Sequence, residues 1–140
     1  MVDHDIIARK IAGASARLAD LERLTSLSRS DFIDHREARD LAAFYFLQAV
    51  QECVDLASHW VADAGLQPGD DAGSVFDALA DEELISSRLA TVLRGAVGLR
   101  NLIAHGYAAI DHGRLHDEIL AGLGDLRRFL RHIAGASEPA

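Results

Sequence analysis

The segment Arg100-Asn101-Leu102-Ile103-Ala104-His105-Gly106-Tyr107 carries side chains suited to phosphodiester cleavage. A histidine such as His105 can take the proton of a ribose 2′-hydroxyl or return a proton to the leaving oxygen. An arginine such as Arg100 stabilises the negative charge that builds on the phosphoryl oxygens. On a helix, Asn101 and His105 share a face, whereas Arg100 lies about 140° away and reaches the same place only through its long side chain. Neither role needs a metal ion.

The spacing of arginine and histidine carries little information by itself. The chain has thirteen arginines and seven histidines, and Arg127 and His132 are separated by the same four residues. The segment at residue 100 differs because it also holds Asn101 and, two residues after the histidine, Tyr107. From the residues alone a structural role stays open, since arginine can bond helix-end carbonyls and a helix dipole favours histidine in the last turn.

The elements that must position this segment are all expected to be helices. Apolar residues recur at spacings of three and four along most of the chain, and no alternating strand pattern or internal repeat is present. The pattern predicts helices over residues 4 to about 27, 35–64, 74 to about 80, 84–105 and about 115–133. Asp31 or Asp34 is expected to cap the second of these helices, and Ser74 with Asp77 resembles a capping box. We expect one all-α domain over residues 1–140, with an ordered core of about 4–133, folded as an antiparallel bundle of four to five main helices.

The long helix over residues 35–64 is expected to be central. Its apolar side chains spread over more than one stripe, which is typical of a helix that touches several neighbours or a second subunit. Trp60 and the run Phe44-Tyr45-Phe46 lie in this helix, and packing in the core or a dimer is favoured for them over stacking on bases. The pattern therefore indicates a chain that dimerises.

Composition limits the partners and the compartment. A formal net charge of −8 opposes non-specific binding to nucleic acid, so any RNA contact must be local. The basic residues are thirteen arginines and one lysine, and arginine suits bidentate phosphate contacts. No stretch has the apolar length of a membrane span and no targeting segment is evident, so a cytoplasmic protein without a membrane partner is expected. A single cysteine, Cys53, excludes an internal disulfide and a cysteine-based zinc cluster.

The Arg100–Tyr107 segment resembles the R-x-x-x-x-H-x-Y signature of HepT-like toxins, a branch of the all-helical HEPN superfamily. The resemblance extends to the layout of the helices and covers about residues 4–133. It rests on Ser30-Asp31-Phe32 at the end of the first helix, on Val54 to His59 in the long helix, and on Phe76 to Ala80 followed by Leu84-Ile85. One departure is Gly106, because the family often has a larger aromatic or acidic residue between the histidine and the tyrosine.

The resemblance implies a metal-independent endoribonuclease without a cofactor, the toxin of a type VII-like toxin–antitoxin system. It implies a homodimer with arginine and histidine from both subunits near a shared cleft. In this chain Arg100 would stabilise the phosphorane, His105 would be the general acid or base, and Asn101 would support the substrate or His105. Tyr107 would be the position at which an MntA-type nucleotidyltransferase antitoxin attaches AMP, placing bulk and negative charge where the RNA phosphate must sit.

Other polar residues allow competing interpretations. Glu52 and Asp55 either orient His105 or, as favoured here, are solvated helix charges. His112 and His116 have a spacing that can bind zinc on a helix, but Gly113 lies between them and no third ligand is near, so metal binding is not favoured. Arg127, Arg128 and Arg131 form a basic edge on the last helix that either meets RNA or offsets neighbouring acids.

The alternative to a ribonuclease is a non-catalytic helical module. Such a module would bind a nucleotidyltransferase partner or a nucleotide and would use the Arg100–His105 motif only structurally. The sequence does not name the RNA, the number of AMP units or the stoichiometry of a toxin–antitoxin complex.

Overall fold

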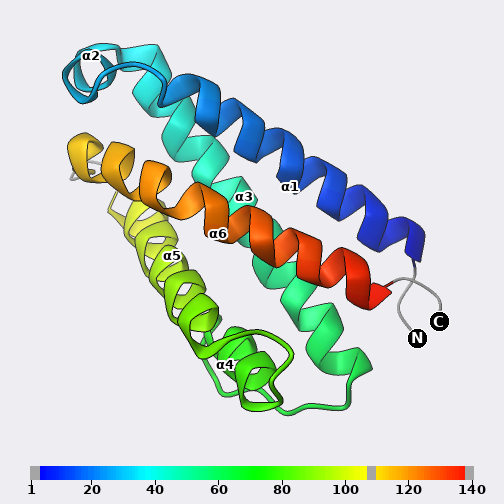
Figure 1. Cartoon of the computed structure of the whole chain (residues 1–140). Coiled ribbons are helices and arrows are strands. Elements are labelled where there is room, and N and C mark those ends of the chain that lie inside the picture. The colour runs from blue at the N-terminus through cyan, green and yellow to red at the C-terminus, as the bar shows by residue number, and fades with distance from the viewer. Residues whose placement is uncertain (1–3, 107–109, 138–140) are drawn as a thin grey trace.

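The computed structural model is all-helical over the residues it describes, 4–106 and 110–137. It has six helices and no strand within those two ranges, which confirms the predicted fold class. The helices are α1 (His4–Leu24), α2 (Arg29–Asp34), α3 (Arg36–Asp63), α4 (Ser74–Asp81), α5 (Ser87–His105) and α6 (His112–Ser137). In Figure 1, α1 and α6 run alongside each other, while α5 with α4 forms the opposite side of the molecule.

The junction between α1 and α3 differs from the sequence expectation. The first helix ends at Leu24, where the Thr25 hydroxyl donates to the Leu21 carbonyl at 2.7 Å. The short helix α2 follows and was not predicted, because its six residues are too few to show a period. Capping by Asp31 or Asp34 is wrong. Ser28 caps α2, and the Nδ1 atom of His35 accepts from the Ala38 N–H at 3.1 Å to cap α3.

The capping box predicted at Ser74 and Asp77 is also wrong. Ser74 is the first helical residue of α4, and its hydroxyl donates to the Asp71 carbonyl at 2.6 Å. The Asp77 carboxylate instead accepts from the Arg94 guanidinium of α5 at 3.0 Å. An ion pair between helices has replaced the local cap, and it fixes α4 against α5.

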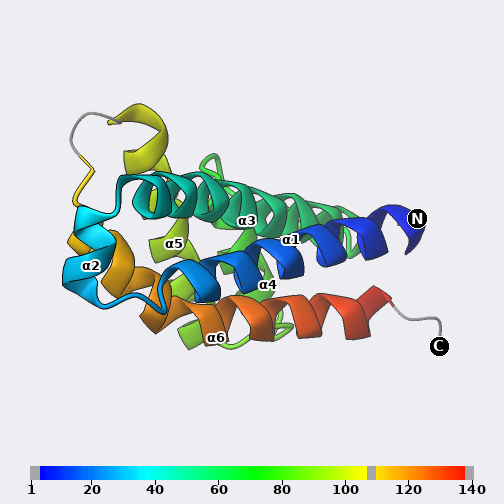
Figure 2. The ribbon, with the colours of Figure 1, turned by 90° about the horizontal axis from the view of Figure 1, so that it is seen from above.

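Helix α3 is the central element, as its sequence predicts. It packs against each of the other five helices. Its buried face includes many small side chains, which allow neighbouring helices to approach closely: Ala38, Ala42, Ala43, Ala49 and Ala57. Figure 2 shows α1 and α6 on one side of α3 and the last turns of α5 emerging beyond it. Gly65 follows α3 with φ of +71°, a left-handed conformation in which glycine carries no steric cost.

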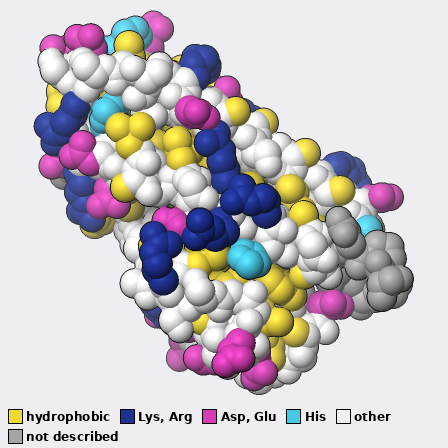
Figure 3. Space-filling model, viewed as in Figure 1, with side chains coloured by type: hydrophobic (Ala, Val, Ile, Leu, Met, Phe, Trp, Pro, Cys, Tyr) yellow, Lys and Arg dark blue, Asp and Glu magenta, His cyan; other side chains and the backbone are white. Residues whose placement is uncertain are grey.

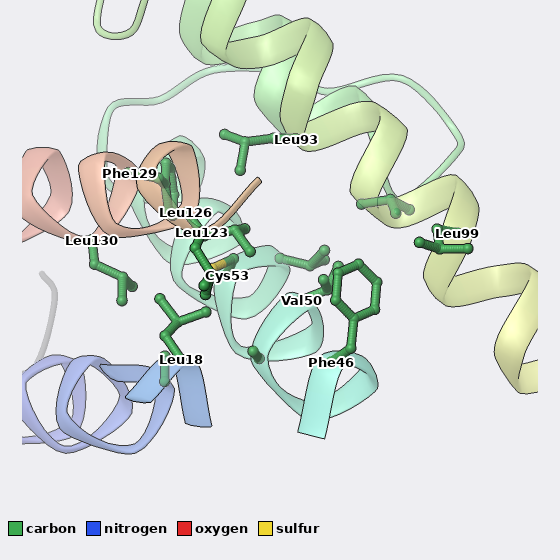
Figure 4. Close-up of a cluster of buried hydrophobic side chains, with 14 of the residues drawn as sticks. Leu18, Phe46, Val50, Cys53, Leu93, Leu99, Leu123, Leu126, Phe129 and Leu130 are labelled. Atoms are coloured by element: carbon green, nitrogen blue, oxygen red, sulfur yellow. The ribbon is translucent and has the colours of Figure 1, made fainter. Parts of the chain in front are cut away.

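The core lies between α1, α3, α5 and α6. Figure 4 shows Leu18 of α1, Phe46 and Val50 of α3, and Leu93 of α5 within one apolar cluster. Cys53 is buried in the same cluster, and burial, aided by the nearby Glu52 charge, raises the pKa of its thiol to about 12. The thiol therefore stays protonated and serves as packing.

Two polar contacts attach α2 and the turn before it to the start of α6. His116 is buried, and its Nε2 atom lies 2.9 Å from the Leu27 carbonyl oxygen, so Nε2 carries the proton and donates. Arg29 of α2 pairs with Asp117 of α6 at 3.2 Å. None of the described helices is both long and apolar enough to cross a membrane.

Two leucines of α6 test whether this cluster carries the stability of the fold. Leu126 is 3% exposed and Leu120 is 53% exposed, on the same helix. We expect Leu126→Ala to lower the free energy of unfolding in urea by about 2–5 kcal/mol, because it removes buried methyl groups and leaves a cavity. The matched Leu120→Ala is expected to change it by about 0.5 kcal/mol or less. Equal losses in the two variants would contradict this description of the core.

Candidate functional site

Residues 100–105 of the segment singled out from the sequence form the last turns of α5. Ser86 caps the start of this helix by accepting from the Leu89 N–H at 3.0 Å, and the helix ends at His105. The Gly106 N–H closes the last turn by donating to the Leu102 carbonyl at 2.8 Å. A Cβ atom at position 106 would lie 2.9 Å from that carbonyl oxygen, which is too close. Glycine is therefore needed here for close backbone approach, and its φ of −124° is not left-handed.

The three predicted catalytic residues lie within this accessible part of α5. Asn101 and His105 are exposed one turn apart on one face, and Arg100 is half-buried. The Nε atom of Arg100 is buried without a hydrogen-bond partner. Among the described residues no hydrogen bond or ion pair engages Arg100, Asn101 or His105, so the expected support of His105 by Asn101 is not formed within one chain. Within ranges 4–106 and 110–137, nothing therefore occupies the hydrogen-bonding groups of these three side chains.

Tyr107 follows this turn and lies outside the described residues, 4–106 and 110–137. Its role as the position of AMP attachment therefore stays a prediction. Its neighbour in the sequence, Gly106, is the C-cap residue of α5.

Glu52 and Asp55 are paired with another helix. The Lys10 ammonium of α1 lies 3.6 Å from a Glu52 oxygen and 3.5 Å from an Asp55 oxygen. Gln51 also donates to Asp55 at 2.9 Å. These contacts favour the interpretation of both carboxylates as structural charges that join α1 to α3.

The two histidines at the start of α6 have separate environments. His116 is committed to the Leu27 carbonyl and packs on Phe32 with ring centroids 5.0 Å apart. His112 is half-buried, and its Nδ1 atom has no hydrogen-bond partner. Within ranges 4–106 and 110–137, no three acidic, histidine or cysteine side chains are grouped as a metal site would require.

Arg39 of α3 is a basic residue of this end of the bundle that sequence reasoning missed. Its Nη1 atom donates to the Ile33 carbonyl at 2.9 Å, while its buried Nε atom has no hydrogen-bond partner and lies 4.0 Å from an Asp40 oxygen. Its positive charge helps to lower the pKa of His112, the first residue of α6. No sequence signal separates Arg39 from the other twelve arginines, because only the fold brings the start of α3 to the start of α6.

Comparison with known proteins identifies a family over most of the chain. The family model described as ribonuclease HepT-like matches residues 14–133. No curated protein matches the chain.

Solved structures share the fold at low sequence identity. One is a tri-AMPylated Shewanella oneidensis HEPN toxin in complex with its MNT antitoxin, with 24% identity, a TM-score of 0.85, and 96% of this chain and 99% of that chain covered. Another is a toxin–antitoxin crystal structure of MntA and HpeT with one tyrosine replaced by alanine, with 23% identity, a TM-score of 0.84, and coverage of 93% and 98%. A cytosolic protein of unknown function from Bacillus subtilis, YutE, is also similar, with 16% identity, a TM-score of 0.84, and coverage of 96% and 90%.

The lowered pKa of His112 predicts how the stability of the fold depends on pH. Burial and the Arg39 guanidinium lower the pKa of His112 from its ordinary value of 6.5, against the opposing pull of Asp40 and Asp111. The folded chain therefore binds this proton less readily than the unfolded chain, and the associated stability is present above about pH 6.5 and lost as the pH falls. We expect urea unfolding at about pH 7.5 and about pH 5.5 to show a smaller acid-induced loss in His112→Gln than in the original chain. An equal loss in both proteins would contradict the proposed environment of His112.

Proposed function

Because the chain belongs to the HepT-like ribonuclease family, we propose that it is a metal-independent endoribonuclease toxin whose site is formed by Arg100, Asn101 and His105. The observation that carries the proposal is the accessible Arg100–His105 turn at the end of α5, in a chain that matches the family over residues 14–133. RNA is the proposed substrate, and no metal or other cofactor takes part.

The proposed reaction is transfer of the phosphoryl group to the neighbouring ribose oxygen. A histidine removes the 2′-hydroxyl proton, and the 2′-oxygen attacks phosphorus. The bond to the 5′-oxygen then breaks, and a protonated group supplies the proton that this oxygen needs. The products are a 2′,3′-cyclic phosphate end and a 5′-hydroxyl end. Arg100 would stabilise the extra negative charge of the phosphorane, and Asn101 would hold the substrate.

A second copy of the chain would supply the remaining acid or base. One His105 cannot act as base at the 2′-oxygen and as acid at the 5′-oxygen in the same step, whereas a homodimer provides two. Apolar side chains near the site support this arrangement: Leu102, one turn before His105 on the register of α5, is 56% exposed, and Leu41 and Phe44 are exposed on α3. Covering such side chains favours association.

We place the regulation of this site at Tyr107, through AMP attached by an MntA-type nucleotidyltransferase antitoxin. The support is the family together with the similar Shewanella oneidensis toxin, which is tri-AMPylated and bound to its antitoxin. Tyr107 follows His105 by two residues in sequence. An added AMP would bring bulk and negative charge to the place of the scissile phosphate, and repulsion between the two phosphates would oppose substrate binding.

Catalysis by Arg100 and His105 predicts loss of RNA cleavage in single variants. We expect His105→Ala to slow cleavage about 10²–10⁴-fold, because the proton transfer is lost. Arg100→Ala is expected to slow it about 10²–10³-fold, because the phosphorane loses its counter-charge. Cleavage of total cellular RNA by purified protein and growth arrest on expression are the two measurements, with folding checked by circular dichroism.

The control for this experiment is His132→Ala. His132 follows Arg127 at the same spacing on α6 and is exposed. It is expected to leave cleavage and growth arrest unchanged. Unchanged toxicity in folded His105→Ala and Arg100→Ala would overturn the catalytic proposal and favour the non-catalytic binding module.

Modification of Tyr107 predicts a mass change that depends on one hydroxyl. We expect coexpression with an MntA-type nucleotidyltransferase to add one or more AMP units, seen by intact-mass spectrometry, and these additions to vanish in Tyr107→Phe. The control is Tyr45→Phe, which removes the other tyrosine of the chain, half-buried under the Arg17 guanidinium. Additions that persist in Tyr107→Phe would move the modification elsewhere.

A further inference from the structure

Four arginines from two helices meet on one face of the molecule. Arg88 lies near the start of α5, and Arg127, Arg128 and Arg131 lie in the second half of α6. Arg88 and Arg128 approach the same Asp125 oxygen, at 2.9 and 4.0 Å. These four residues form what is here termed the arginine band. Figure 3 shows basic side chains gathered across the middle of the face on which α6 lies.

The arginine band carries an excess of positive charge. Arg127 pairs with Glu22 of α1, and Asp125 serves both Arg88 and Arg128. Within the described ranges Arg131 has no ion pair or hydrogen bond. Two carboxylates therefore face four guanidinium groups, although the chain as a whole has a net charge of −8. Arg94 of α5 shows the opposite charge balance, because its single guanidinium pairs with two carboxylates, those of Asp71 and Asp77.

A groove beside the arginine band has the chemistry to hold a sugar-phosphate backbone. Arg127 and Arg131 flank this groove of about 320 Å³ between α1 and α6. Its other lining residues are Ile11, Ser15, Leu130 and Ala134. Guanidinium forks bind phosphate oxygens in pairs, and apolar side chains can cover the carbon face of a ribose. The groove therefore has positively charged side chains at its rim and apolar side chains inside.

Helix α5 sets the distance between the arginine band and the proposed catalytic turn. Arg88 and His105 stand seventeen residues apart near its two ends, which corresponds to about 25 Å at 1.5 Å per residue. Figure 1 shows α5 beginning near α4, and Figure 2 shows its last turns across α3 from most of α6. A DNA strand rises about 3.4 Å per nucleotide and stacked RNA rises less, so roughly seven or more nucleotides span this length.

We propose that the arginine band and its groove are a second, phosphate-binding surface that holds RNA away from the catalytic turn. The inference rests on the proposed ribonuclease function. It follows from the charge balance, because affinity for a polyanion needs local cations, and Arg100 is the one Lys or Arg side chain among residues 100–106 of the proposed catalytic turn. An RNA that reaches both surfaces binds more tightly than one confined to the catalytic turn.

The test is the salt dependence of RNA binding in Arg128→Gln/Arg131→Gln. This double variant keeps the Arg88–Asp125 and Arg127–Glu22 pairs, so folding is preserved. Both it and its parent carry His105→Ala so that RNA is not cut, and the probe is fluorescent oligouridine of about 30 nucleotides, longer than the span required. Loss of two phosphate contacts is expected to weaken binding about 20-fold at about 0.1 M NaCl and to reduce the slope of log Kd against log[NaCl] by about 1.4.

The matched control is Arg9→Gln/Arg23→Gln. These exposed arginines of α1 do not line the groove, and their loss changes the net charge by the same amount. The control is expected to keep nearly the parent affinity and slope. Equal behaviour of the two double variants would overturn the proposal, as would a band variant that binds RNA normally but no longer binds the nucleotidyltransferase.

The two proposals fail in different ways. RNA binding through the arginine band by a chain that cleaves no RNA would contradict the ribonuclease and support the surface. Cleavage that depends on His105, together with an unchanged salt slope in the band variant, would support the ribonuclease and contradict the surface.

Discussion

The fold depends on burying α3 on nearly all of its sides. A helix of this length that packs against five others must be apolar around most of its circumference, and this explains why its side chains form no single stripe. Its alanines let α1, α5 and α6 approach closely, and larger residues such as Phe46 fill the spaces between them. Because α5 crosses this helix, its last turn emerges beyond the core and presents His105 to solvent.

The chemistry of the site is separated from the interactions that hold the fold together. Several charged side chains are paired across helices, as Lys10 is with Glu52 and Asp55. Arg100 and His105 have no such partner among the described residues, and the buried Nε atom of Arg100 lacks even a hydrogen bond. An unsatisfied buried donor costs free energy, and a bound phosphate would recover it. The proposed function assigns these partners to a substrate and to a second copy of the chain.

Sequence reasoning succeeded where a long period or a glycine specifies local structure. The central α3, the stop after it at Gly65 and the end of α5 at His105 all follow from such signals. It failed where tertiary contacts replaced local ones. Ser74 and Asp77 are spaced as in a capping box, but the Asp77 carboxylate accepts a hydrogen bond from Arg94, seventeen residues away, and does not cap the helix.

The candidate site shows the same division. Arg100, Asn101 and His105 are adjacent in sequence and could be selected from it, whereas Arg39 and His112 meet only because α3 and α6 begin at the same end of the bundle. The arginine band is similar, since Arg88 and Arg128 share Asp125 across forty residues of chain. Spacing along the sequence identifies groups on one helix, and it does not identify groups that two helices bring together.

The closing of α5 by the Gly106 N–H has a consequence for motion. Terminal turns are the parts of a helix that open at the lowest free-energy cost, because few hydrogen bonds and little buried apolar surface must be given up. His105 lies in such a turn, whereas Leu93 and Val97, earlier in the same helix, are buried. Local fraying can therefore reorient the imidazole, or admit a modifying enzyme to the chain beyond it, while the bundle stays folded.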